Sequence, residues 1–413
     1  MVAELVIHLG DHKTGTTAIQ SALAAGQLRI GGAAVFYRGQ QHHRLARPLM
    51  DRHPDPAIYR PRYAEIGAAL DASPAAIGVI SSEHFEYVAP AVLAAVIAEC
   101  LPQYQGRLRL VSYVRPHVDR FVASFAERTK MGLTHDQMEP FLDRIIRQRM
   151  LDYTPRFRRW QAVFGEAFCL RPYVRDQLEG GDVVADFAAL LAAGQSWDLA
   201  ATPIRNSSPS LGDLALIRSL QRQGAALRPR LPDDARAALG WTLAEFMAAQ
   251  PSPAPVRLGV ERQVAGRIAR RFQADAVALD AAFFHGSPMT TAIRAAPAKG
   301  LAQGQSLDLA DNLSPAALRL AAVGAALLVQ IAAADPAHFA THFRHADTRK
   351  PRTARVLAGA AGRAGKGPHQ SATGPTPAVP AASGLRPILQ RLTRLVRRLP
   401  NSLRDRLRNR LRR

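Results

Sequence analysis

The chain is poor in cysteine and in aromatic residues. Its 413 residues include only two cysteines, Cys100 and Cys169, and aromatic side chains make up 6% of the sequence. So few cysteines exclude a disulfide-stabilised scaffold and fit a reducing compartment. The amino-terminal segment has no basic stretch followed by a long apolar one, so it does not resemble a secretory signal. We therefore expect a cytoplasmic protein.

Acidic residues are nearly absent from the last part of the chain. Residues 349–413 contain 17 lysines and arginines but one acid, Asp405, which gives this part a charge of +16. Because the whole chain carries +21, the first 348 residues carry only +5. The extreme basicity therefore belongs to the tail, and it does not indicate nucleic-acid binding by the rest of the chain.

The tail divides into two segments of different composition. Residues 349–384 are rich in alanine, glycine and proline, which predicts a disordered linker. In residues 385–413, leucines recur at helical spacing among arginines, which predicts a basic amphipathic helix. We expect this helix to bind an anionic membrane surface, which would place the protein at the inner membrane face. Nucleic acid is a less favoured partner, because the segment lacks aromatic residues for base stacking.

Long apolar segments are also rare, and residues 316–333 form the strongest candidate for a membrane-spanning helix. This segment contains Arg319 and Gln330, and it follows Ser314 and Pro315, a pair typical of a helix start. The polar residues within it favour a buried helix over a membrane span.

Short apolar runs alternate with helical patterns in the first half of the chain. Runs with the length of buried strands occur at 5–9, 33–37, 76–81, 107–114 and 168–174, and helical patterns at 16–25, 90–100, 118–130 and 137–150. This alternation predicts an α/β fold with a parallel sheet flanked by helices. Ligands of such sheets bind at the carboxyl ends of the strands. From about residue 210 the chain has helical patterns, apart from an expected loop at 291–313.

The segment after the first apolar run carries the strongest functional signal. Gly10 ends the run, and a loop then leads into a helical pattern through Lys13, Thr14, Gly15, Thr16 and Thr17. A strand, a short loop and a helix start form an anion site, because the first helical N–H groups are free and the helix dipole favours negative charge. The Lys13 ammonium adds a positive charge, so phosphate is the expected occupant.

Two common nucleotide-binding patterns are absent from this loop. The pattern G-x-x-x-x-G-K-[ST] needs a lysine after its second glycine, and the pattern G-x-G-x-x-G needs a glycine where this chain has His12. The sequence Lys-Thr-Gly-Thr-Thr instead resembles the 5′-phosphosulfate loop of the sulfotransferase family. This resemblance covers about residues 4–210 by motif. It implies a bacterial-type, P-loop-like sulfotransferase domain over 1–345, with a helical subregion from about 210.

The resemblance implies which residues hold the donor, 3′-phosphoadenosine 5′-phosphosulfate (PAPS), and the product, its 3′,5′-bisphosphate (PAP). Lys13 and the N–H groups of Thr14 to Thr17 would hold the 5′-phosphosulfate, and Arg115 would hold the 3′-phosphate. The family serine usually lies eight positions after the arginine, where this chain has Ala123. Ser124 follows one position later, so it reaches the phosphate only if the register of the helix is shifted.

Two softer candidates for cofactor binding come from the same resemblance. Tyr173 ends the last apolar run, where the family often places an aromatic ring against the adenine. Arg205 belongs to a polar loop, and a similar loop returns to the cofactor in the family.

The segment Ile80 to Val88 carries the candidate base. Glu83 follows a strand, and a carboxylate there would take the proton from an acceptor hydroxyl. His84 is the alternative base, because histidine titrates near neutrality. Successive residues after a strand point in different directions, so we expect only one of the two to face the site, and we favour Glu83. His43 is a candidate for lining the acceptor pocket, and the pair formed with His42 lacks a third ligand at metal spacing, so we predict no metal.

The sequence thus favours a sulfotransferase that moves a sulfonate group from PAPS to a hydroxyl of a saccharide, a lipid or another small molecule. Two alternatives stay open. A P-loop-like kinase or nucleotide hydrolase would need a magnesium ligand after another strand, and no convincing apolar run ending in aspartate is present. A non-catalytic protein would bind a membrane surface through its basic tail.

Overall fold

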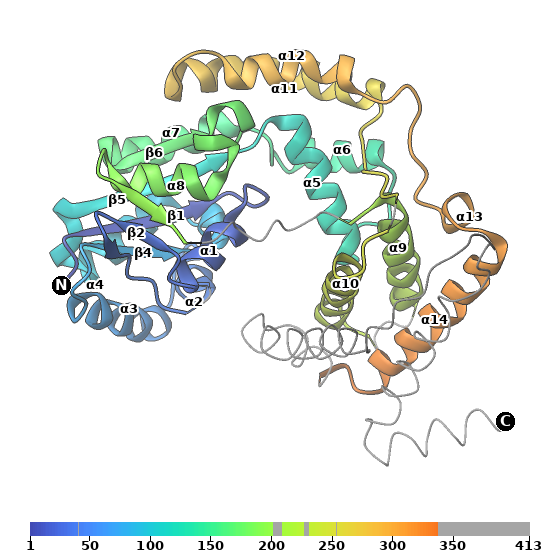
Figure 1. Ribbon diagram of the computed structural model, residues 1–413, viewed down its shortest axis with the longest axis horizontal. Coiled ribbons are helices and arrows are strands. Elements are labelled where there is room, and N and C mark those ends of the chain that lie inside the picture. Colours follow the sequence, from blue (N-terminus) through green and yellow to red (C-terminus); the bar gives the residue numbers. More distant parts are fainter. Residues whose placement is uncertain (40, 201–208, 227–230, 253, 338–413) are drawn as a thin grey trace, which may run out of the picture. The chain divides into compact units, whose positions relative to one another are not determined.

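A four-stranded parallel sheet forms the centre of the α/β fold. The computed structural model describes residues 1–413 except 40, 201–208, 227–230, 253 and 338–413 (Figure 1). The strand order is β4-β1-β5-β6, and every neighbouring pair is parallel. The strands are β1 (Glu4–Gly10), β4 (Ile77–Ser81), β5 (Leu108–Val114) and β6 (Phe168–Pro172). The prediction of a parallel sheet flanked by helices is confirmed.

The two faces of the sheet belong to two hydrophobic clusters. Because side chains alternate along a strand, Leu5, Ile7 and Leu9 of β1 face one cluster while Val6 faces the other. The first cluster includes residues of α3 (Pro56–Asp71), α4 (Pro90–Cys100), α5 (His117–Lys130) and α7 (Tyr153–Phe164). The second includes residues of α1 (Thr16–Ala24) and α8 (Val183–Ala192). Helices therefore cover both faces, as a sheet of apolar strands requires.

The strand predicted at 33–37 is wrong in length and in place. Only β3 (Ala33–Ala34) forms there, in a separate antiparallel sheet of order β3-β2-β7 with β2 (Leu28–Ile30) and β7 (Trp197–Leu199). Gly31 and Gly32 have φ angles of 56° and 78°, which allow the tight reversal between β2 and β3. Phe36 then reaches the main sheet through one isolated bridge to Gly78.

The helical prediction after residue 210 is largely confirmed. The described α-helices of this part are α9 (Leu211–Ala226), α10 (Asp233–Ala248), α11 (Arg262–Phe283), α12 (Pro288–Lys299), α13 (Leu309–Asn312) and α14 (Pro315–Ala334). Earlier in the chain lie α2 (His43–Ala46) and α6 (Met138–Arg147). The expected loop at 291–313 is wrong, because α12 occupies its first part. This helix packs along α11 and buries Met289 and Ile293. Its other residues are small or polar, so the sequence carries little helical periodicity.

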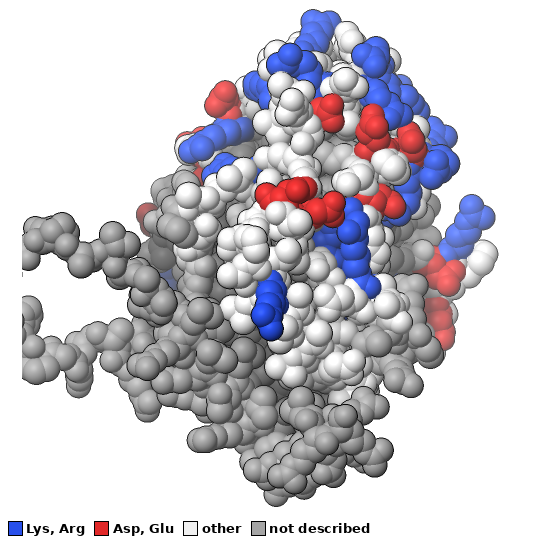
Figure 2. Space-filling view, turned by 90° about the vertical axis from the view of Figure 1, so that its right-hand side faces the viewer, with Lys and Arg blue, Asp and Glu red and all other residues white. Residues whose placement is uncertain are grey.

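The helix α14 is long and apolar, but it is not a buried helix. Among the described residues, it is the one helix with the length and hydropathy to cross a membrane, and 17% of its apolar window is buried. Leu320 and Val323 are 45% and 62% exposed, so the prediction of burial is wrong. Figure 2 shows the side of the molecule on which α14 lies. In the lower half of that view, the described surface carries few lysine, arginine, aspartate or glutamate side chains.

Three sequence predictions fall outside the described residues. They are the linker at 349–384, the amphipathic tail at 385–413 with its membrane partner, and the cofactor contact of Arg205. They stay predictions.

Candidate functional site

Within the described residues, the loop after β1 leaves the N–H groups of the first two residues of α1 without acceptors. Gly15 is the residue before the helix and has a φ of 81°, and a Cβ there would lie 2.7 Å from Val183 Cγ1. Only glycine fits both constraints. No side chain caps the helix, and the described part of the chain provides no acceptor for the N–H groups of Thr16 and Thr17. These groups are therefore free to bind an anion, as the predicted site requires, and residues 11–15 are called the anion loop below.

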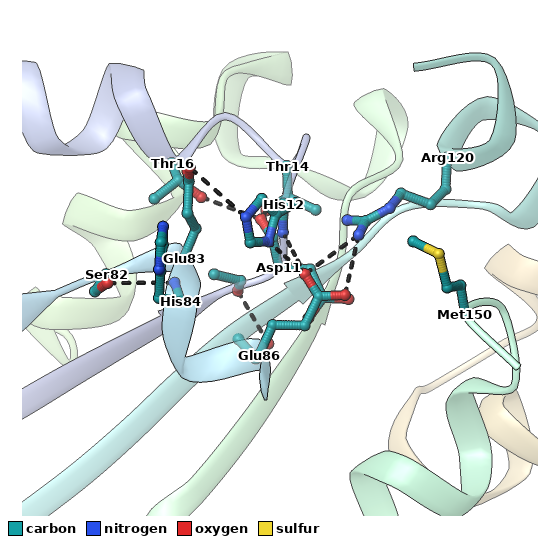
Figure 3. Close-up of polar contacts among 12 residues, drawn as sticks. Asp11, His12, Thr14, Thr16, Ser82, Glu83, His84, Glu86, Arg120 and Met150 are labelled. Atoms are coloured by element: carbon teal, nitrogen blue, oxygen red, sulfur yellow. Dashed lines mark hydrogen bonds and ion pairs between the residues drawn. The ribbon is translucent and has the colours of Figure 1, made fainter. Parts of the chain in front are cut away.

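The threonine hydroxyls of the loop have a structural role. Thr14 Oγ1 donates to the carbonyl oxygen of Asp11 at 2.6 Å, and Thr16 Oγ1 donates to the same oxygen at 3.2 Å (Figure 3). Both side chains are buried, whereas Thr17 is exposed. The hydroxyls thus fix the loop around one carbonyl, and the backbone N–H groups remain for ligand binding.

Lys13 is held by a carboxylate beside the loop. Its ammonium lies 2.7 Å from Glu127 Oε2, and Lys130 lies 2.6 Å from the same oxygen. The other oxygen of Glu127 accepts a hydrogen bond from Trp241 Nε1 at 2.9 Å. Burial raises the pKa of Glu127, but the two lysines outweigh it and hold that pKa at about 2. A ligand anion at the loop would compete with Glu127 for Lys13.

Arg115 and Tyr173, which the sequence placed at the ends of two strands, contact each other next to the anion loop. The Arg115 guanidinium lies over the Tyr173 ring, 4.9 Å from its centroid. The ring in turn borders Gly15, because a Cβ on Gly15 would lie 3.3 Å from Tyr173 Cε2. Ser124 is 8% exposed on α5, and no hydrogen bond of its hydroxyl is found within the described residues. The described contacts therefore support Arg115 and Tyr173 as neighbours but do not bring Ser124 to them.

Glu83 and His84 face the same space, which corrects the expectation that only one would do so. They begin a short 3-10 helix, η2 (Glu83–Tyr87). The backbone N–H of His84 donates a hydrogen bond to Ser82 Oγ at 3.2 Å, which caps the start of this helix. The Glu83 carboxylate lies 3.8 Å from His12 Nε2, and the His12 and His84 rings are 5.9 Å apart. The chain turns tightly after β4 instead of staying extended, so two consecutive long side chains reach one place.

His43 lies on the other side of His84. Their ring centroids are 4.2 Å apart, and His43 Nδ1 lies 2.8 Å from Ser82 Oγ. Burial, with the neighbouring positive groups, lowers the pKa of His43 to about 3 and that of His84 to about 4. Both rings are therefore neutral near pH 7, and His43 stays a candidate for contact with the acceptor.

A buried network of charged groups beneath the loop was not predicted from the sequence. Glu86 Oε2 accepts from the backbone N–H of His12 at 3.0 Å and lies 2.6 Å from His12 Nδ1 (Figure 3). Arg120 donates to Glu86 Oε1 at 3.0 Å, and Arg156 donates to both carboxylate oxygens of Asp11, at 2.7 and 2.5 Å. The network ties the loop after β1 to η2, α5 and α7.

The charges of this network shift the pKa values of its members. Burial raises the pKa of Glu86, but Arg120, His12 and Arg156 lower it well below its usual range. Burial lowers the pKa of His12, and the hydrogen bond and charge of Glu86 outweigh that effect and raise it. In the sequence, the position of Glu86 three residues after the candidate base Glu83 was the one signal that could have pointed to its place in the site. Arg120 and Arg156 lie in amphipathic helices and carry no such signal.

Acid should destabilise the protein already near neutral pH. Burial lowers the pKa of His8 to about 3 and that of His42 to about 4. Below the unfolded value of 6.5 the unfolded chain binds protons that the folded chain does not, so stability is full above pH 6.5 and falls with pH. These two groups give a slope of roughly 3 kcal/mol per pH unit near pH 5. Urea unfolding midpoints at pH 7.5, 6.5 and 5.5 measure this loss of stability, and equal midpoints at the three pH values would contradict the prediction.

Comparisons with models of protein families, with characterised proteins and with solved structures found no significant match. A function for this chain is therefore inferred from its own residues and their geometry.

Proposed function

We propose that the protein is a PAPS-dependent sulfotransferase. The observation that carries the proposal is the loop from Asp11 to Gly15, which presents Lys13 and the free N–H groups of Thr16 and Thr17 at the carboxyl end of the central strand. Arg115 and Tyr173 lie beside that loop and supply a second cation and an aromatic surface. A bisphosphate nucleotide needs two such anion-binding elements and a surface for its base.

Each of these residues has a role in the proposed transfer. The helix N–H groups and Lys13 hold the 5′-phosphosulfate, after Lys13 exchanges its contact with Glu127 for one with the ligand. Arg115 holds the 3′-phosphate, and Tyr173 contacts the adenine. The acceptor oxygen forms a bond to sulfur while the bond from sulfur to the bridging oxygen breaks. Lys13 offsets the charge that develops on that oxygen, and Glu83 takes the acceptor proton.

The distinguishing property of such an enzyme is recognition of the 3′-phosphate. Arg115→Ala removes a charge-assisted contact, so affinity for adenosine 3′,5′-bisphosphate should fall about 10- to 100-fold. Affinity for the nucleotide that lacks the 3′-phosphate should change little. Calorimetric titration of both nucleotides measures this, without and with Mg²⁺.

Arg107, which precedes the other end of β5 and is exposed, provides the matched control. Arg107→Ala should bind both nucleotides like the wild-type chain. Equal affinity of the wild-type chain for the two nucleotides would refute the role of Arg115. Binding that requires Mg²⁺ and ignores the 3′-phosphate would favour a kinase or a nucleotide hydrolase.

Lys13→Ala should slow turnover more than it weakens binding of the product. We expect turnover to fall on the order of 10²–10³-fold, the size of the effect when one pre-organised charge stabiliser is lost. Release of PAP from the donor, with water or an added alcohol as acceptor, is a readout that needs no knowledge of the natural acceptor. Lys299→Ala, in an exposed part of α12, is the control. Unchanged PAP release in Lys13→Ala would exclude the proposed role.

The acceptor is proposed only as a hydroxyl compound. His43, His84 and Tyr87 lie around Glu83 and His12, so aromatic and imidazole rings surround the proposed attack point. Rings of this kind pack against sugar or alkyl groups and fit a saccharide or lipid hydroxyl. Labelled donor incubated with panels of glycans and lipid extracts identifies it.

A further inference from the structure

Three side chains with metal-ligating atoms converge at the edge of the anion loop. His12 comes from the loop after β1, and Glu83 and His84 come from η2. One ligand atom of each lies within 4.8 Å of those of the other two. All three residues are partly exposed, so an ion from solvent can reach them. The pair His42 and His43, from which the sequence predicted no metal, is not part of this group.

His12 is held in the way that metal-binding histidines usually are. Its Nδ1 is bonded to the Glu86 carboxylate at 2.6 Å, and its Nε2 points toward Glu83 at 3.8 Å. A buried carboxylate behind the ring fixes its orientation and leaves the other nitrogen for an ion. Glu86 is itself anchored by Arg120, so this support is part of the rigid network. Figure 3 shows His12 between the two carboxylates.

The surroundings of His84 also leave its ring free to act as a metal ligand. Arg47 Nε donates to His84 Nδ1 at 3.4 Å, which is a long contact, and the Arg47 side chain is exposed. Its guanidinium can turn into solvent when a cation arrives. The ligand atoms of a tetrahedral zinc ion lie about 3.4 Å apart, given bonds of about 2.0–2.2 Å. A closure of roughly 1 Å by partly exposed side chains brings the three atoms to that spacing.

We propose that His12, Glu83 and His84 form a binding site for Zn²⁺ or a similar divalent transition metal. Two imidazoles and one carboxylate are ligands that zinc prefers, whereas magnesium and calcium prefer oxygen ligands alone. Three protein ligands leave one position open for water or a ligand. The site does not depend on the sulfotransferase proposal. If both hold, the ion occupies Glu83 and prevents it from acting as the base, so zinc inhibits transfer.

Binding of the metal to the full-length chain tests this site. After treatment with a chelator, the chain is titrated with Zn²⁺ against a chromophoric chelator and with Co²⁺ by visible absorption. One ion per chain is expected, with the absorption of four-coordinate cobalt. Glu83→Gln and His84→Gln should each weaken zinc affinity at least about tenfold, because each removes one of three protein ligands.

Two further measurements keep the test decisive. His53→Gln changes an exposed histidine outside the group and should bind zinc like the wild-type chain. His84→Gln should unfold in urea like the wild-type chain, which excludes misfolding as the cause of lost binding. Absence of stoichiometric binding, or binding that neither ligand variant weakens, overturns the proposal. Titration of PAP without metal judges the sulfotransferase proposal separately.

Discussion

Glu83→Gln should slow sulfonate transfer by roughly 10²–10⁴-fold, while the affinity for PAP stays within about twofold of the wild-type value. Glutamine keeps the shape of the side chain and removes its basicity. The backbone of Glu83 lies against the end of β1, since a Cβ on Gly10 would lie 3.0 Å from Glu83 Cα, and its carboxylate faces His12 Nε2 of the anion loop at 3.8 Å. Single-turnover rates of PAP release with an added alcohol, together with calorimetric titration of PAP, separate the chemical step from binding.

His84→Gln is the matched comparison, because it changes the adjacent residue that faces the same space. If Glu83 is the base, His84→Gln should cost much less than Glu83→Gln. The pH profile does not separate the two candidates, since burial lowers the pKa of His84 to about 4 and keeps that ring unprotonated at pH 5 to 7. The two variants therefore decide. Near-wild-type turnover in Glu83→Gln with a large loss in His84→Gln would reverse the assignment, and no loss in either would move the test to His43.

Glu86→Gln should lower the free energy of unfolding by about 3–5 kcal/mol, the usual effect of breaking a buried ion pair. Glu86 and Arg120 are 7% and 3% exposed, so the arginine left behind cannot recover its hydration. The variant should also weaken PAP binding, because Glu86 holds the backbone N–H and the ring of His12 in the anion loop. Urea unfolding measures the first effect and calorimetry the second.

Glu99→Gln provides the control for this prediction. Glu99 also pairs with an arginine, Arg60, but both side chains are largely exposed, at 38% and 60%. Its loss should therefore lower the free energy of unfolding much less than the loss of Glu86, because solvent screens an exposed ion pair. The double variant Glu86→Gln with Arg120→Met should regain part of the lost stability, since it removes the unpaired buried charge as well. Equal losses in Glu86→Gln and Glu99→Gln would show that the network contributes little.

The sequence predicted the elements that local patterns determine. Four of the five apolar runs became β1, β4, β5 and β6, because buried parallel strands need continuous apolar residues. The helix α4 begins and ends at the predicted residues, Pro90 and Cys100. The loop between β1 and α1 was predicted because Gly10 ends an apolar run and Gly15 precedes a helical pattern, and both signals are local.

Other features depended on contacts that no local pattern records. The sequence shows α12 only weakly, since its burial comes from packing on α11. The apolar pattern of α14 predicted a helix correctly but not its exposure, because the neighbours of a helix decide whether its apolar face is covered. The short β3 reflects the turn at Gly31 and Gly32, which moves the chain to a second sheet.

The same division holds for the candidate site. The sequence by itself determined that a loop with Lys13 and Gly15 joins β1 to a helix, that Arg115 follows a strand end and that Glu83 and His84 lie near the same edge of the sheet, because strand ends and loops are local. Only the tertiary structure placed His12 between Glu83 and Glu86 and joined Glu86 to Arg120. These residues come from separate elements, and a buried charge finds its partner wherever packing brings an opposite charge, at any distance along the chain.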